Sequence, residues 1–136
     1  MPPVTRWMVR AAMLYLVAAL FLGIAMQLPW GGRVPVLGVV WPTYLHLLVV
    51  GWLSQLIFGV AYWMFPRYSA ERPRGSETLG WATFGLLNAG LLLRAVAEPL
   101  RAISGRGQAV LVVAAVLQAA AALAFAANTW PRVRER

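Results

Sequence analysis

The chain has 136 residues, of which 61% are hydrophobic, with a mean hydropathy of +0.69 and a formal net charge of +8. A soluble domain of this length cannot hide so much apolar surface, because small folds leave a large share of their surface exposed. The lack of cysteine excludes disulfides, thiolate metal sites and iron–sulfur clusters, and twelve arginines gathered near helix ends favour lipid contact over nucleic-acid binding.

Four apolar runs reach the length of about 20 residues that a membrane-spanning helix needs. They comprise residues 7–28, 43–65, 78–97 and 108–128. Loops marked by proline and glycine separate the runs, at residues 29–42, 66–75 and 98–107. We therefore expect one all-α domain, 1–136, in which four transmembrane helices form an up-down antiparallel bundle.

The arginines indicate how such a bundle would be oriented. The amino-terminal segment, the second loop and the tail share one side of a four-span protein, and together they carry eight arginines. The opposite side carries Arg33, Arg101 and Arg106. Because arginine accumulates on the cytoplasmic side, we expect a multi-pass protein of the cell inner membrane with both termini cytoplasmic. Six tryptophans fall at the predicted boundaries: Trp7, Trp30, Trp41, Trp63, Trp81 and Trp130.

The first helix, 7–28, carries Met26 near its outer end. A thioether there usually fills a gap between helices or faces lipid. Met26 becomes a candidate metal ligand only if a neighbouring helix offers a second ligand at the same depth.

The second helix, 43–65, contains His46, which is the only histidine of the chain. An ionisable side chain at membrane depth is costly, so it is a functional hypothesis by default. At 100° per residue His46 shares an apolar face with Val50, Leu53, Ile57, Val60 and Met64, whereas the opposite face carries Gly51, Gln55, Gly59 and Tyr62. The second face favours packing against a helix. The first favours lipid, a neighbouring helix or a large flat apolar group such as a porphyrin.

The third helix, 78–97, carries Arg94 close to the predicted depth of His46. An arginine there is costly unless it is paired. It could pair with the propionates of a heme, pair with Glu98 one turn later, or extend to the headgroups. His46 and Arg94 at one depth form a coherent set for a heme site in which His46 is the axial ligand of the iron, whereas contact with lipid or a neighbouring helix is the alternative that the periodicity by itself favours. The second ligand could be Met26 or His46 of another copy, and otherwise the iron is five-coordinate.

The fourth helix, 108–128, is rich in alanine, which indicates close helix contact and favours oligomerisation. Asn88 and Gln118 lie in the middle of the third and fourth helices, where hydrogen bonds between helices are expected. Asp is absent and the four Glu are expected in loops or at helix ends, which disfavours a proton-coupled carrier.

One segment carries a family resemblance: Tyr44-Leu45-His46, Gly51-Trp52 and the run from Phe58 to Arg67. It resembles the second helix of heme–copper oxidase subunit I, nearest to the nitric oxide reductase and C-family oxidase branches. The runs Gly23–Pro29 and Gly90–Pro99 are similar to segments of the same family and its small members. The resemblance implies that His46 binds a low-spin heme near the outer face. The further histidines of that family have no counterpart here, so one chain cannot build its binuclear centre and is not expected to be the enzyme.

The sequence therefore predicts an integral membrane protein that binds heme b through His46, with Arg94 as a propionate partner. It would serve electron transfer or gas-ligand sensing. We expect it to contact membrane lipids and to act as a homo-oligomer (dimer or trimer) or within a respiratory complex, and we expect no nucleic-acid partner. The alternative is a heme-free structural or accessory subunit of a larger respiratory membrane complex, in which His46 and Arg94 only form hydrogen bonds between helices.

Overall fold

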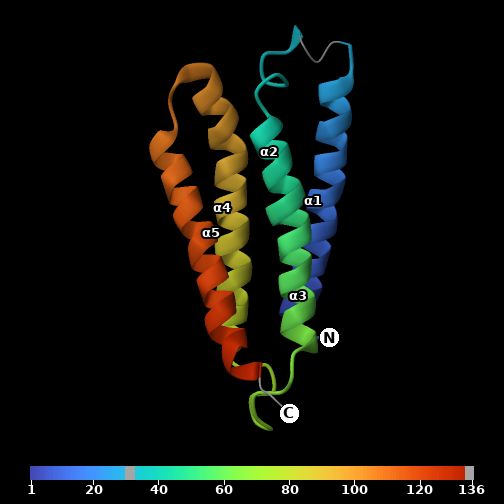
Figure 1. The fold of residues 1–136 in the computed structure, drawn as a ribbon, viewed down its shortest axis with the longest axis vertical. Helices are drawn as coiled ribbons and strands as arrows, with labels where there is room; N and C mark the ends of the chain where they lie inside the picture. The colour runs from blue at the N-terminus through green and yellow to red at the C-terminus, as the bar shows by residue number, and fades with distance from the viewer. Residues whose placement is uncertain (30–32, 134–136) are drawn as a thin grey trace.

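The structure is a computed structural model that describes residues 1–29 and 33–133 (Figure 1). These residues contain helices and connections but no strand. The elements are α1 (Pro3–Gln27), α2 (Trp41–His46), the π-helical segment η2 (Leu47–Ser54), α3 (Gln55–Met64), α4 (Glu77–Ser104), α5 (Gln108–Thr129) and the short 3₁₀ turn η3 (Trp130–Arg132). Because α2, η2 and α3 are continuous, the described residues form four helices long and apolar enough to cross a membrane, as predicted.

The four helices lie side by side along the long axis of the molecule (Figure 1). α1 packs along η2 and α3, and α4 packs along α5. Figure 1 shows the connection from α3 to α4 at the same end as the amino terminus, and the connections α1–α2 and α4–α5 at the other end. Trp30, which was expected at the outer boundary, lies outside the described residues.

The third helix is longer than the sequence predicted. We expected it to end at Ala97 and a loop to follow, but α4 continues through Pro99 to Ser104, so that prediction was wrong. A proline inside a helix loses one backbone hydrogen bond and disfavours the helix without forbidding it. The helix ends instead at Gly105, whose φ of 71° is the left-handed cap that favours glycine.

The two faces predicted for the second helix are confirmed. Gly51, Gln55, Gly59 and Tyr62 are buried, whereas the opposite face is partly or largely exposed. A Cβ at Gly51 would lie 2.8 Å from the Cγ of Tyr15 and 2.8 Å from a methyl of Leu91. Glycine is therefore required there for α1 and α4 to approach η2.

The small residues of α5 serve the contact with α4. Ala114 and Ala121 are fully buried, and a Cβ at Gly90 would lie 2.9 Å from the carbonyl oxygen of Ala114. Asn88 forms the expected bond between helices, since it accepts a hydrogen bond from the hydroxyl of Tyr15 at 2.8 Å. Gln118 differs: its Nε2 is buried and has no partner in the part of the chain that the structure describes.

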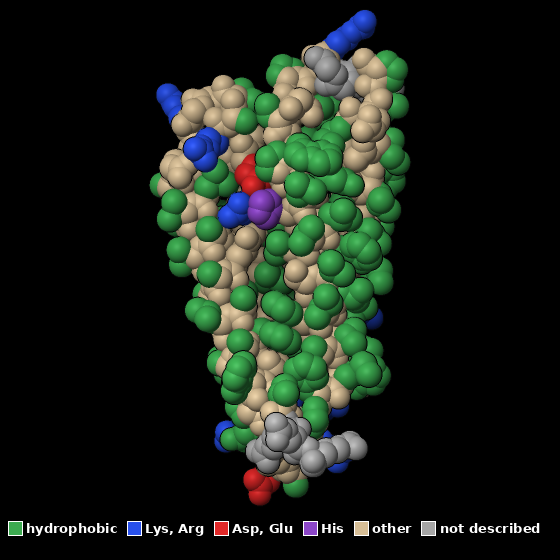
Figure 2. Space-filling model, viewed as in Figure 1, with side chains coloured by type: hydrophobic (Ala, Val, Ile, Leu, Met, Phe, Trp, Pro, Cys, Tyr) green, Lys and Arg blue, Asp and Glu red, His purple; other side chains and the backbone are tan. Residues whose placement is uncertain are grey.

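The surface of the helices is strongly apolar. Large hydrophobic side chains point outward along the middle of the molecule, among them Leu14, Phe21, Val96 and Leu123. Figure 2 shows this apolar band, with most charged side chains near the two ends. A band of this kind needs an apolar surrounding, because soluble proteins rarely expose contiguous apolar surface of that size.

Candidate functional site

A cluster of polar side chains interrupts the apolar band where α2 meets α4. Figure 2 shows the single histidine there, in contact with an acidic and a basic side chain. Glu98 lies at the centre. Its Oε2 accepts a hydrogen bond from the hydroxyl of Thr43 at 2.9 Å, and its Oε1 lies 3.2 Å from Arg94 Nη1 and 3.3 Å from His46 Nδ1. The structure therefore brings His46 and Arg94 together through a carboxylate.

The local sequence explains this geometry. Thr43 and His46 are three residues apart on α2, and Arg94 and Glu98 are four residues apart on α4, so each pair shares one helix face. Glu98 is a residue whose role sequence reasoning underestimated, because it was expected at a helix end. The spacing of Arg94 and Glu98 was the available signal, and the pairing considered as an alternative for Arg94 is the one that forms.

The cluster is largely removed from solvent. The side chains of Glu98, Arg94 and His46 are 8%, 18% and 30% exposed. Charged groups interact more strongly there than in water, and an unpaired charge would be costly. One carboxylate thus compensates the guanidinium and lies within reach of the imidazole at the same time.

The imidazole of His46 is oriented through one of its two nitrogens. Nδ1 lies 2.8 Å from the carbonyl oxygen of Pro42, which can only accept, so Nδ1 carries the proton. Glu98 Oε1 lies near the same nitrogen. In the neutral ring Nε2 then holds the lone pair, and no hydrogen bond to Nε2 forms within the described residues. This tautomer is the one that metal-bound histidines commonly adopt.

A π-helical segment, η2, begins directly after His46. The hydroxyl of Ser54 donates to the carbonyl of Val49, five residues earlier, at 2.9 Å. Such wide turns are rare and are frequent at functional sites. No sequence signal indicated this segment, because each of its residues also fits an ordinary helix.

Met26 lies apart from the cluster. It lines a hollow of about 400 Å³ with other residues of the end of α1 and with Trp41 and Tyr44. His46 does not line this hollow. Ligation of iron by Met26 therefore stays a prediction that the contacts around His46 do not support.

The cluster is not a site for a metal ion held by side chains alone. Within residues 1–29 and 33–133, no group of three or more His, Cys, Asp and Glu side chains could bind an ion. A metal at His46 would need further ligands from a cofactor or from another chain.

Comparison with known proteins adds no assignment: no family model, no curated protein and no solved structure gives a significant match to the chain.

Proposed function

We propose that this chain is an integral membrane protein that binds heme b, with Nε2 of His46 as an axial ligand of the iron. The observation that carries the proposal is the orientation of the imidazole. Pro42 accepts from Nδ1 at 2.8 Å and Glu98 Oε1 lies 3.3 Å from the same nitrogen, which directs the lone pair to the opposite nitrogen. A backbone carbonyl or a carboxylate behind the ligating histidine is the usual support of a metal-bound imidazole.

The surroundings fit a porphyrin in two respects. Leu53 and Ile57, on the face of His46, are 44% and 53% exposed and offer an apolar surface to a flat ring. Arg94 binds Glu98 through Nη1 only, while its Nε is buried without a partner in the described residues. Its guanidinium therefore has donors left for a propionate. The bound heme would supply one-electron transfer or a binding position for a small gas.

In the proposed arrangement the four helices cross the inner membrane of the cell as an up-down antiparallel bundle. Both termini then lie in the cytoplasm. The helix lengths, the connections at alternating ends and the excess of arginine at the end that holds both termini support it. His46 then lies in the outer half. Because the imidazole of His46 is 30% exposed at the surface of the bundle, a second copy of the chain or a partner subunit completes the site, and a homo-oligomer is the simplest form.

The test is the absorption spectrum of the protein purified from heme-replete cells. We expect a Soret band that disappears in His46→Ala and persists in Thr43→Ala, which removes a neighbouring polar group but leaves the imidazole. A persistent band in His46→Ala would refute the assignment. A changed reduced spectrum in Met26→Leu would show that Met26, and not a second copy, supplies the other ligand.

A second candidate function, a heme-free accessory subunit of a respiratory membrane complex, has one observation in its favour. Glu98 already partners Thr43, Arg94 and His46, so the cluster is complete as a contact between helices. A colourless preparation in which His46→Ala lowers stability would support this alternative.

A further inference from the structure

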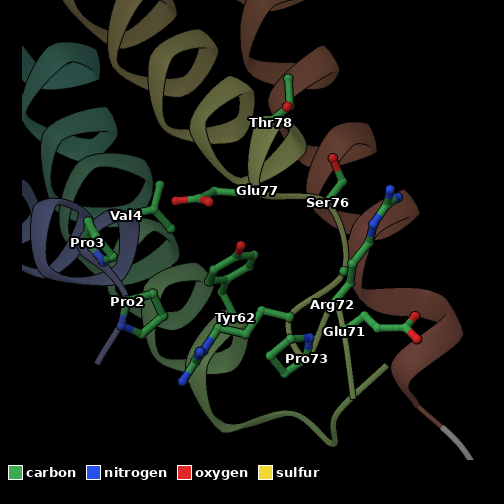
Figure 3. A pocket seen from close by; sticks show the side chains of 12 residues that line it. Pro2, Pro3, Val4, Tyr62, Glu71, Arg72, Pro73, Ser76, Glu77 and Thr78 are labelled. Carbon is green, nitrogen blue, oxygen red and sulfur yellow. The ribbon is translucent and has the colours of Figure 1, made fainter. Parts of the chain in front are cut away.

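Two hollows lie at the end of the molecule where α3 ends and α4 begins. One has a volume of about 570 Å³ and lies between the start of α1 and the loop before α4 (Figure 3). The other has a volume of about 520 Å³ and is lined by Trp63, Arg67, Arg74 and Arg132 among others. We refer to the second as the arginine hollow. The two hollows share Pro73 and Arg74.

The two hollows differ in charge. Glu71 and Glu77 line the first together with Arg72 and Arg74, so its charges balance. Figure 3 shows the carboxylate of Glu77 and the hydroxyl of Tyr62 directed into it. The arginine hollow contains three arginines and no acidic residue among its described lining. Both ion pairs of the described residues involve Glu98, at the far end of α4, so neither neutralises this hollow.

The buried cation of the arginine hollow is Arg132, which is 1% exposed. Its guanidinium donates to the carbonyl oxygens of Tyr62, Phe65 and Pro66 at 3.0, 2.8 and 3.0 Å. These bonds satisfy carbonyl acceptors at the end of α3, which supply a partial negative charge but no carboxylate. Arg132 is therefore fixed in place, no carboxylate of residues 1–29 and 33–133 forms an ion pair with it, and its positive charge makes the hollow attractive to an anion.

Arg74 has unused hydrogen-bonding capacity beside Arg132. Its Nε is buried and has no partner in the described chain. A buried donor without an acceptor is costly, so an acceptor from outside the chain would stabilise it. Arg67, which is exposed at the rim, can add a planar donor pair of the kind that binds phosphate bidentately.

We propose that the arginine hollow binds the phosphate of an anionic membrane lipid. The wall of the hollow favours a lipid over a soluble phosphate. Trp63 and Met64 line it, are 42% and 68% exposed, and continue outward from α3 as an apolar surface for an acyl chain. Tryptophan and arginine at one level are typical of the membrane interface. This site is separate from His46 and does not depend on heme.

The experiment measures lipid binding by native mass spectrometry of the full chain in neutral detergent, with phosphatidylglycerol and phosphatidylcholine as probes. We expect selective retention of phosphatidylglycerol, with affinity about thirtyfold lower in the double variant Arg67→Gln/Arg74→Gln. The matched control, Arg6→Gln/Arg72→Gln, removes the same charge outside the hollow and should change affinity less than about threefold. Arg132 is left intact, because it bonds three carbonyl oxygens at the end of α3 and its replacement would change local structure as well as charge.

The measurement has outcomes that overturn the proposal. An equal loss of phosphatidylglycerol affinity in the two double variants would show a general effect of charge and not a binding site. Displacement of phosphatidylglycerol by an equal concentration of glycerol phosphate or inorganic phosphate would show that the ligand is a soluble phosphate. Thermal unfolding in the same samples gives a second readout: phosphatidylglycerol should raise Tm in the parent protein and the control, but not in Arg67→Gln/Arg74→Gln.

Discussion

Replacing Glu98 with alanine tests the polar cluster most directly. The change leaves the guanidinium of Arg94, which is 18% exposed, without its carboxylate, and Thr43 without an acceptor. Removing one partner of a buried ion pair costs about 3–5 kcal/mol. Because Arg94 retains some exposure, we expect the lower end of that range, about 3 kcal/mol, with about 0.6 kcal/mol more for the interhelical hydrogen bond of Thr43.

The assay is the free energy of unfolding in lipid bicelles, measured by steric trapping. Glu98→Gln retains the side-chain volume and one acceptor oxygen, so its free energy of unfolding should fall by about half as much as that of Glu98→Ala. The double variant Arg94→Leu/Glu98→Leu should recover much of the loss, because it removes both charges from an apolar site. Glu71→Ala, in an exposed loop, is the matched control, with an expected change within about 0.5 kcal/mol. The reasoning is refuted if Glu98→Ala and Glu71→Ala are equally stable.

Three further substitutions test the packing and the helix ends. Gly51→Ala should lower the free energy of unfolding by about 1–3 kcal/mol, because its Cβ would meet Tyr15 and Leu91. In the control Gly85→Ala the new Cβ meets nothing within 4 Å, so stability should be unchanged or higher. Equal effects of the two substitutions would contradict the close approach at Gly51. Asn128→Ala should cost about 1–3 kcal/mol and speed hydrogen exchange at the start of α4, because Asn128 bonds both the N–H and the carbonyl of Ser76; unchanged exchange would refute this role. Arg132→Lys should cost about 3 kcal/mol in the same unfolding assay, because one ammonium cannot serve three carbonyls in the positions of a guanidinium; a loss below about 1 kcal/mol would show that these bonds contribute little.

Apolar runs and periodicity were sufficient to predict the number of helices and the faces of the second one. The residues Gly51 and Gln55 are buried and Ile57 is exposed, as the 100° spacing indicated. The end of α4 was misjudged because Pro99 is a strong sequence signal for a break. The structure instead ends the helix at Gly105, where the chain can adopt a positive φ.

The candidate site was predicted only in part. Depth along two helices correctly brought His46 and Arg94 to one level, because a helix rises by a fixed distance per residue. Depth alone could not show that Glu98 lies between them, since that depends on the rotation of α4 about its axis and on the continuation of the helix past Pro99. Nor could it show that Met26 lines a hollow to which His46 does not contribute.

The amino-acid sequence by itself determined the general character of each helix: that it is long enough to cross a membrane, that it is apolar, and which charges lie at its ends. These properties are local, because they follow from transfer of single side chains between water and an apolar medium. Only the tertiary structure decided which residues meet. The approach of α2 to α4 converts a histidine, an arginine and a glutamate from different positions into one cluster, and the turn after α5 places Arg132 under the end of α3. Such contacts depend on helix rotation and close packing, to which hydropathy is insensitive.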